Sequence, residues 1–210
     1  MEWATMHEYI DGHWSQYDFA IVDVEGNGEL PQEIVEVALA HVRRGKVEPR
    51  PDSWLVRPSR PVTGRAARFH GISNDMVAGA PSVATIATDL MAAFGPDVVV
   101  GHNVRVDIEL LGRALPDWQP AIVIDTLQLA RSVLPGAPSY SLGDLVMQRG
   151  LGNRGMPNHR ASADALATAH LFLDLVQQME AGGCATLRKL LDVAGVTTPG
   201  FDNNRQQGLF

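Results

Sequence analysis

The chain has 210 residues and a formal charge of −7, which suit one α/β domain with a short extension at each end. No apolar run is long enough to span a membrane, and Met1–Asp18 lacks the basic start and apolar centre of a secretory signal. The single cysteine, Cys184, excludes an internal disulfide framework and favours a cytoplasmic location. The acidic balance argues against bulk electrostatic binding of nucleic acid, but not against an enzyme whose acids hold cations.

In chain order, the pattern predicts an antiparallel meander followed by alternating helices and strands. After a variable extension at 1–17, apolar runs predict strands at 19–24, 34–42 and 54–56. Helical spacing and capping residues predict five helices, and short apolar runs predict two strands between them. The helices are expected at 81–94, 104–115, 125–134, 141–151 and 161–180, and the strands at 98–100 and 121–124. We therefore expect an α/β fold over 18–180, with a mixed five-stranded sheet flanked by helices. A short helix at 186–194 and a flexible tail should complete residues 181–210.

Two carboxylates leave the first predicted strand together. Asp23 and Glu25 are one residue apart, so alternation along the strand places them on the same face. A turn, Gly26-Asn27-Gly28, follows them. Two carboxylates this close repel each other, and a cation held between them removes the repulsion. A strand end with two solvated acids is the alternative interpretation.

Three residues of related chemistry stand at the ends of later elements. Asp107 lies in the predicted helix 104–115, while His159 precedes the last long helix, whose first turn carries Asp164. Carboxylates that converge from separate elements are costly unless cations neutralise them, and such oxygen ligands suit Mg²⁺ or Mn²⁺. Two ions can clamp the attacking and leaving oxygens of a phosphoryl displacement. A histidine can accept the proton of the attacking water.

In this order and spacing, the motifs resemble those of the DEDDh 3′–5′ exonucleases. That family includes the proofreading subunit of bacterial replicative DNA polymerase and its free-standing relatives. The resemblance covers residues 18–178 and is carried by Asp23-Val24-Glu25, Gly101-His102-Asn103 with Asp107, and His159-Arg160-Ala161-Ser162-Ala163-Asp164. Phe69–Ser73 and Ile124–Leu127 are also similar to that family.

The resemblance implies a ribonuclease-H-like fold and a two-metal hydrolysis that releases nucleoside 5′-monophosphates. The implied substrate is the 3′ end of single-stranded or frayed DNA, with RNA as a second substrate. Carried over by position, Asp23 would bridge both metal ions, and Glu25 and Asp164 would complete the first metal site. Asp107 would serve the second, and His159 would be the general base.

The resemblance also implies contacts with the substrate. Gly26 and Asn27 would lie by the sugar of the terminal nucleotide, and His70 and Ile72 by its base. Asn103 either contacts the substrate or holds the strand-to-helix turn in which it lies.

The chain departs from the family at two places. Where the family usually has a Glu-Thr-Thr-Gly run, this chain has Glu25-Gly26-Asn27-Gly28, so glycine takes the place of a threonine near the terminal 3′-hydroxyl. The backbone N–H can serve there, because glycine lets the chain approach closely. Val106 stands where the family usually has an aromatic residue before the acid.

Two other functions fit the sequence. The acidic balance and short chain suit a trimmer of very short RNA or a hydrolase of a small nucleotide. The departure at Gly26-Asn27 suits a binding module for a clamp or for nucleic acid in which catalysis has decayed, although the complete set of acids speaks against it.

Basic residues are concentrated in one short stretch. Arg57, Arg60, Arg65 and Arg68 fall close together in a chain that is acidic overall. They form either a solvated loop or a rim that contacts phosphate groups.

The C-terminal segment ends Gln206-Gln207-Gly208-Leu209-Phe210. It resembles the short peptides that bacterial replication proteins insert into the pocket of a sliding clamp. An extended tail offers Leu209 and Phe210 as apolar anchors and Gln206 for hydrogen bonds. Free-standing relatives sometimes form homodimers, but no decisive apolar stripe for dimerisation is found here.

Overall fold

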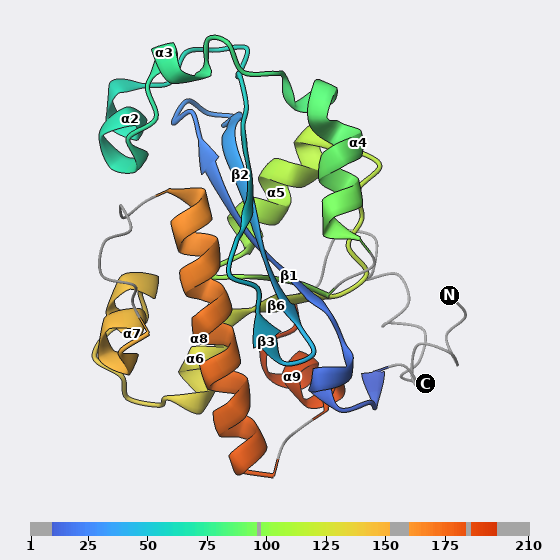
Figure 1. Ribbon diagram of the computed structural model, residues 1–210. Coiled ribbons are helices and arrows are strands. Elements are labelled where there is room, and N and C mark those ends of the chain that lie inside the picture. Colours follow the sequence, from blue (N-terminus) through green and yellow to red (C-terminus); the bar gives the residue numbers. More distant parts are fainter. Residues whose placement is uncertain (1–9, 96–97, 152–159, 184–185, 197–210) are drawn as a thin grey trace, which may run out of the picture.

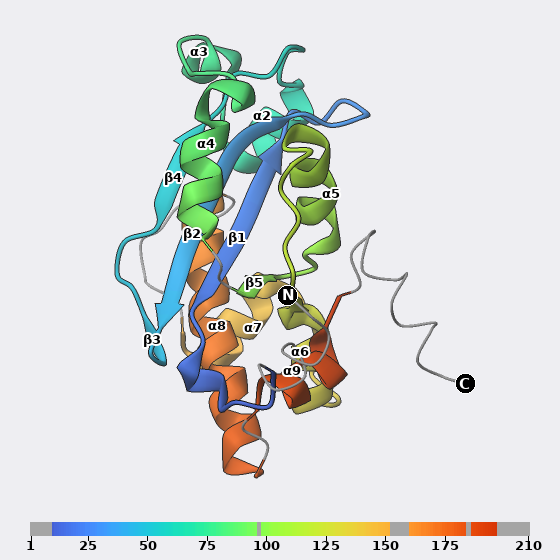
Figure 2. The ribbon, with the colours of Figure 1, turned by 90° about the vertical axis from the view of Figure 1, so that its right-hand side faces the viewer.

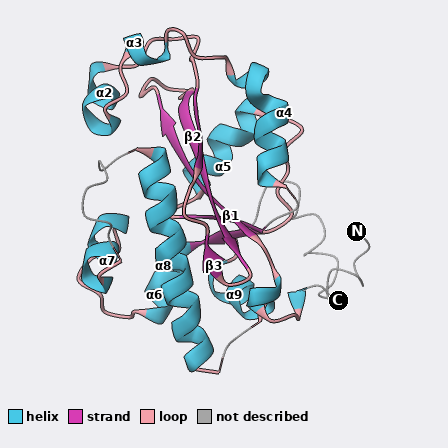
Figure 3. Ribbon diagram, viewed as in Figure 1, coloured by secondary structure: helices cyan, strands magenta, loops and turns pink. Residues whose placement is uncertain are grey.

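The computed structural model describes residues 10–95, 98–151, 160–183 and 186–196. Within these ranges, one mixed sheet of six strands forms the centre of the molecule (Figures 1 and 3). The strand order is β3-β2-β1-β5-β6, and β4 also pairs with β2. β1 is antiparallel to β2 and parallel to β5, which is parallel to β6. The strands are β1 (Phe19–Gly26), β2 (Ile34–Arg43), β3 (Lys46–Val47), β4 (Asp52–Leu55), β5 (Val98–Gly101) and β6 (Val123–Asp125).

The described sheet has one strand more than the five expected. The single strand predicted at 54–56 corresponds to β4, and a separate short strand, β3, precedes it along β2. Pro49 and Pro51 stand between the two. Because proline has no N–H to donate, it cannot continue a hydrogen-bonded ladder, and this divides the outer strand.

Helices cover both faces of the sheet (Figures 1 and 2). One face is covered by α8 (Ala161–Ala181), α6 (Thr126–Val133), α7 (Leu142–Arg149) and α9 (Leu187–Ala194), and the other by α4 (Val83–Phe94) and α5 (Arg105–Ala114). Side chains of β1 alternate between two cores: Phe19 and Ile21 pack with α8, and Ala20 and Val22 pack with α4 and α5. Of the helices in the described ranges, none has the length and apolarity needed to cross a bilayer.

Two short helices lie where the sequence indicated only loop. They are α2 (Gly64–His70) and α3 (Asn74–Val77), which follow the N-caps Thr63 and Ser73. Each cap hydroxyl accepts a backbone N–H of the first turn, so local capping stabilises helices too short to show an apolar period. Arg65 and Arg68 therefore lie exposed on a helix rather than in a loop.

The described part of the N-terminal extension belongs to the same core. It contains a short 3₁₀ helix, η1 (Trp14–Gln16). The buried indole of Trp14 donates to the Glu180 carboxylate at 3.0 Å, near the end of α8. The carbonyl of Gly12 accepts the N–H of Leu187 in α9 at 3.1 Å. The domain boundaries expected at 18 and 180 stay a prediction, and described residues on both sides of them pack together.

The turn after β1 depends on a glycine at position 28. Gly28 has a φ of +80°, and a Cβ there would lie 2.5 Å from the Thr63 hydroxyl and 2.8 Å from the Ala66 methyl group. Gly71, after α2, has a φ of +75° but nothing within 4 Å of a Cβ. An alanine at position 71 would therefore meet backbone strain alone, and an alanine at position 28 would meet strain and a steric clash.

We expect Gly71→Ala to lower the free energy of unfolding by about 1–2 kcal/mol through strain alone. Gly28→Ala should cost about 1–3 kcal/mol more, because overpacking against α2 adds to the strain. Urea denaturation of both variants measures the difference. Equal losses would contradict the close packing of α2 on this turn.

Candidate active site

The site begins where β1 extends past its parallel neighbour. β1 pairs with β5 only from Phe19 to Ile21, but with β2 as far as Gly26. Asp23 and Glu25 therefore lie on the part of β1 that has a neighbour on one side only. By alternation they share the face of Phe19 and Ile21, which is covered by α8.

The first turn of α8 brings Asp164 to this face. One carboxylate oxygen from each of Asp23, Glu25 and Asp164 lies within 4.8 Å of the others. The N–H of Asp164 donates to the carbonyl of Arg160 at 3.0 Å, which begins the helix. Three acids predicted to share one site are therefore in one cluster.

Asp107 approaches from the open edge of β1. It lies in the first turn of α5 and is buried. Its Oδ1 accepts the N–H of Val24 at 2.9 Å, a donor that β5 does not reach. The bond fixes the carboxylate beside the strand residue between Asp23 and Glu25.

The acids strongly perturb one another. Burial first, and then the charges of Asp164 and Glu36, raise the pKa of Asp23 to about 8. Burial and the charge of Asp23 likewise raise the pKa of Glu25 to about 8. Burial and Asp23 raise the pKa of Asp107 well above its usual value. These shifts mean that the folded protein disfavours the ionised form of each group.

A divalent cation fits this donor set. Its charge would offset the repulsion and keep the carboxylates ionised. The cluster of described residues offers carboxylate oxygens alone, the ligands preferred by hard cations such as Mg²⁺ and Mn²⁺. The arrangement can therefore hold a metal ion between β1 and α8.

A fifth carboxylate, Glu36 of β2, secures the start of α8. It faces Glu25 across the β1–β2 ladder and is 1% exposed. Arg160 donates to both of its oxygens, at 2.9 and 2.7 Å, and the N–H of Ala161 donates at 3.0 Å. Burial acts to raise the pKa of Glu36, but the hydrogen bonds and charge of Arg160 outweigh it and hold the pKa below its usual value. Glu36 therefore stays ionised and ties α8 to the sheet one turn before Asp164.

Sequence reasoning missed both residues of this pair, although each left a signal. Glu36 is a lone acid in an apolar strand, and a buried acid there requires a partner. Arg160 lies within the motif that contains His159 and Asp164, and its cation can pair with a buried acid. The contact joins positions 124 residues apart, so only the fold identifies the partner.

The residues predicted to contact the substrate after β1 and at the end of α2 make hydrogen bonds within the protein. Asn27 is buried, and its Oδ1 accepts the N–H groups of Glu29 and Glu33 at 3.3 and 3.0 Å, which closes the loop. His70 is also buried, and its Nδ1 accepts the N–H of Ile72 at 3.1 Å. Its Nε2 therefore carries the proton and donates to the carbonyl of Gly26 at 3.2 Å. The expected contacts with a nucleotide stay predictions.

Of the remaining candidates for catalysis and substrate binding, one holds a turn, one lies in a core and one falls outside the described residues. Asn103 is exposed with a φ of +58°, and its N–H donates to Asp125 at 2.9 Å, which holds the turn between β5 and α5. Ile72 is buried in a small core with Val62. His159, the predicted base, lies outside the described residues.

Comparisons with known proteins show the family of the chain. The family model described as exonuclease matches residues 20–172. The chain belongs to this exonuclease family and is a nuclease of the hydrolase class.

The chain is also similar to individual proteins and to a solved structure. The chain is 29% identical to the DNA polymerase III subunit epsilon of Aquifex aeolicus over 77% of this chain and 81% of that protein. It is 28% identical to the 3′–5′ exonuclease DinG of Bacillus subtilis, over 82% of this chain but 19% of that protein. It also spans 13% of PolC-type DNA polymerases III from Thermotoga. The structure of Exonuclease X in complex with 5′ overhanging duplex DNA has a TM-score of 0.68 and 33% identity, over 83% of this chain and 98% of that one.

The raised pKa values predict how stability changes with pH in the absence of metal. Asp23 and Glu25 keep their protons up to about pH 8 in the folded state, but lose them near about pH 4 when unfolded. This stabilises the fold at low pH and is lost as pH rises toward 8. In EDTA, we expect the Tm of the wild type, relative to that of Asp23→Asn, to fall between about pH 5 and about pH 8.

Thermal unfolding at several pH values measures this difference. Mg²⁺ or Mn²⁺ added near pH 8 should raise the Tm of the wild type more than that of the variant. A difference that stays constant with pH would contradict the raised pKa values of these acids.

Loss of the buried ion pair between Glu36 and Arg160 should destabilise the fold more than loss of a partly exposed ion pair of the same geometry. Arg160→Ala leaves a buried carboxylate short of two hydrogen bonds, so we expect a loss of about 3 kcal/mol in unfolding free energy and weaker metal binding. The control is Arg149→Ala, which removes an equally bidentate but partly exposed pair with Asp174 of the same helix. It should cost about 1 kcal/mol or less. Denaturant unfolding and metal titration of both variants test this difference, and equal effects would refute it.

Proposed function

We propose that this protein is a 3′–5′ exonuclease that removes nucleotides one at a time from single-stranded or frayed DNA. The observation that carries the proposal is the cluster of Asp23, Glu25 and Asp164 in a chain of the exonuclease family. The direction of digestion and the choice of DNA rest on the names of relatives, which include a 3′–5′ exonuclease and a DNA polymerase subunit.

In the proposed reaction, the oxygen of a water molecule bonds to the terminal phosphorus. The bond between that phosphorus and the 3′ oxygen of the preceding nucleotide breaks, and a nucleoside 5′-monophosphate leaves. The proton of the water passes to His159, and the freed 3′ oxygen takes a proton from solvent. The role of His159 rests on the sequence alone.

Mg²⁺ or Mn²⁺ are the proposed cofactors, two ions per site. Asp23, Glu25 and Asp164 would hold the first ion, and Asp23 and Asp107 the second. When bound, the two ions would lower the pKa of the attacking water and offset the charge on the leaving oxygen. Glu36 and Arg160 would keep Asp164 in place without touching the substrate.

The proposed process is proofreading or repair of DNA in the cytoplasm, by analogy with the epsilon relative. A contact with a sliding clamp through Gln206, Leu209 and Phe210 is proposed from the sequence, because the tail lies outside the described residues. Formation of a homodimer stays a prediction.

Digestion of a single-stranded DNA labelled at its 5′ end tests the proposal. With Mg²⁺ or Mn²⁺ we expect a ladder of labelled products that shorten with time, and none with EDTA. Asp23→Ala should lower the rate by on the order of 10³-fold or more, because the lost ligand supports several kcal/mol of transition-state stabilisation.

Asp89→Ala is the matched control, since it removes an exposed acid of α4 and should keep the wild-type rate. Immediate release of the labelled nucleotide would indicate digestion from the other end. A wild type without a ladder, or an active Asp23→Ala, would reject the proposal. A labelled RNA and a dinucleotide tried in parallel decide between DNA, RNA and short substrates.

A further inference from the structure

A concave surface lies on the face of the sheet opposite Asp23 and Glu25. It is a cavity of about 660 Å³ between the loop after β1, the loop after β4, the start of α4 and the end of α5. Its floor is apolar, with Ile34, Val56 and Leu110 from the core on the α4 and α5 side. We call it the arginine groove, because Arg57, Arg60 and Arg113 line it. Its volume lies within the range of sites that hold a nucleotide-sized ligand.

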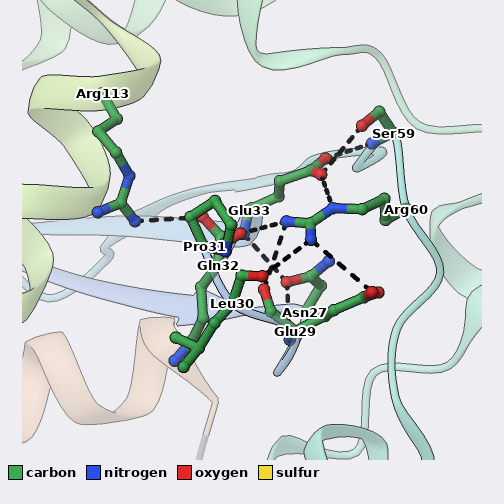
Figure 4. Close-up of polar contacts among 9 residues, drawn as sticks. All are labelled: Asn27, Glu29, Leu30, Pro31, Gln32, Glu33, Ser59, Arg60 and Arg113. Carbon is green, nitrogen blue, oxygen red and sulfur yellow. Dashed lines mark hydrogen bonds and ion pairs between the residues drawn. The ribbon is translucent and has the colours of Figure 1, made fainter.

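One of these arginines has a structural task. Arg60 pairs with the Glu33 carboxylate at 2.6 Å, and its guanidinium also donates to the carbonyls of Glu29, Leu30 and Pro31 (Figure 4). Ser59 donates to the same carboxylate through its N–H and hydroxyl groups. These bonds hold the conformation of the loop at 27–33, which lines the groove at 31–33 and continues directly from the strand that carries the acids.

The other two arginines hydrogen-bond to neutral backbone carbonyls. Arg113 donates to the carbonyl of Gln32 at 3.2 Å, and Arg57 to the carbonyl of Ala78 at 3.4 Å. Within the described ranges, no carboxylate forms an ion pair with either. A guanidinium has five N–H donors, so each can bind further acceptors while its own carbonyl contact fixes its direction. Two uncompensated positive charges beside one cavity stand out in a chain with a net charge of −7.

The position of the groove indicates which ligand it takes. Planar guanidinium groups match the oxygens of phosphate, and an apolar floor suits sugar and base surfaces. The end of the strand being shortened must reach the carboxylates on the α8 face. A backbone lying in the groove would pass on the other side of the 27–33 loop.

Resting on the proposed exonuclease function, we propose that the arginine groove binds the sugar–phosphate backbone of the second DNA strand, the one not being shortened. Arg57 and Arg113 contact its phosphates. The loop held by Arg60 separates this strand from the one that enters the acidic site. The enzyme is thereby suited to 3′ ends in partly duplex DNA as well as to free single strands.

The test compares one labelled strand alone with the same strand annealed to a longer complement, so that its 3′ end is recessed. In Arg57→Gln/Arg113→Gln, we expect the KM for the duplex to rise about tenfold more than the KM for the single strand. The slope of log KM for the duplex against log salt should fall by about two, one for each phosphate contact removed.

Two further variants serve as controls. Arg44→Gln/Lys46→Gln removes the same charge at the β2–β3 turn, at the other end of β2, and should keep the wild-type ratio of KM values. Arg57→Lys/Arg113→Lys keeps the charge and should retain most of the salt slope. Thermal unfolding of each variant shows that it is folded.

The outcomes distinguish the two proposals. If the wild type digests neither substrate, the proposed function fails. If it digests both and Arg57→Gln/Arg113→Gln keeps the wild-type ratio and salt slope, only the groove assignment fails. An equal rise in both KM values would also overturn it, since the groove would then contact the strand being shortened.

Discussion

The repulsion among carboxylates at the end of β1 is the constraint on which the rest of the site depends. Asp23, Glu25 and Asp164 converge in buried or partly buried positions, where burial and neighbouring negative charges raise the pKa of Asp23 and of Glu25. A fold normally separates such groups, because an unpaired buried charge costs several kcal/mol. This fold instead fixes them in place, and a divalent cation bound between them would cancel the repulsion.

Regular secondary structure holds the acids in place. β1 carries two of the acids past the end of β5, where the free N–H of Val24 binds Asp107. α8 carries the third, and the ion pair of Glu36 with Arg160 ties its first turn to the neighbouring strand. The negative charge of Glu36 also contributes to the raised pKa of Asp23. Arg160 and the N–H of Ala161 stabilise the charge of Glu36 itself. The unfavourable repulsion therefore falls on the acids that can bind metal.

Local signatures in the sequence predict the main sheet strands and the long helices, and the structure brings three of the predicted acids together. Alternation placed Asp23 and Glu25 on one face, and helical period located α4, α5 and α8. Where local signals were weak, the prediction was incomplete. α2 is held by its Thr63 cap and by packing on Gly28, and β3 separates from β4 at two prolines. The partners of Glu36 and the carbonyls gathered by Arg60 are set by contacts between distant segments, which no local pattern encodes.

The net charge of −7 gains a different meaning once the charges are placed in the fold. An acidic total is expected of a nuclease whose site collects carboxylates, since bound cations reverse the field there. A phosphate backbone responds to the local charge of the surface that it contacts. The positive charges of Arg57 and Arg113 are not neutralised there, because their hydrogen-bond partners are carbonyls and not carboxylates. The acids thus lie on the α8 face of β1, whereas the two arginines, from the loop after β4 and from α5, lie on the other side of the sheet. In the proposed mode of binding, a DNA backbone would approach the arginines directly and the acids only through bound metal, so the two sides of the sheet would take different strands.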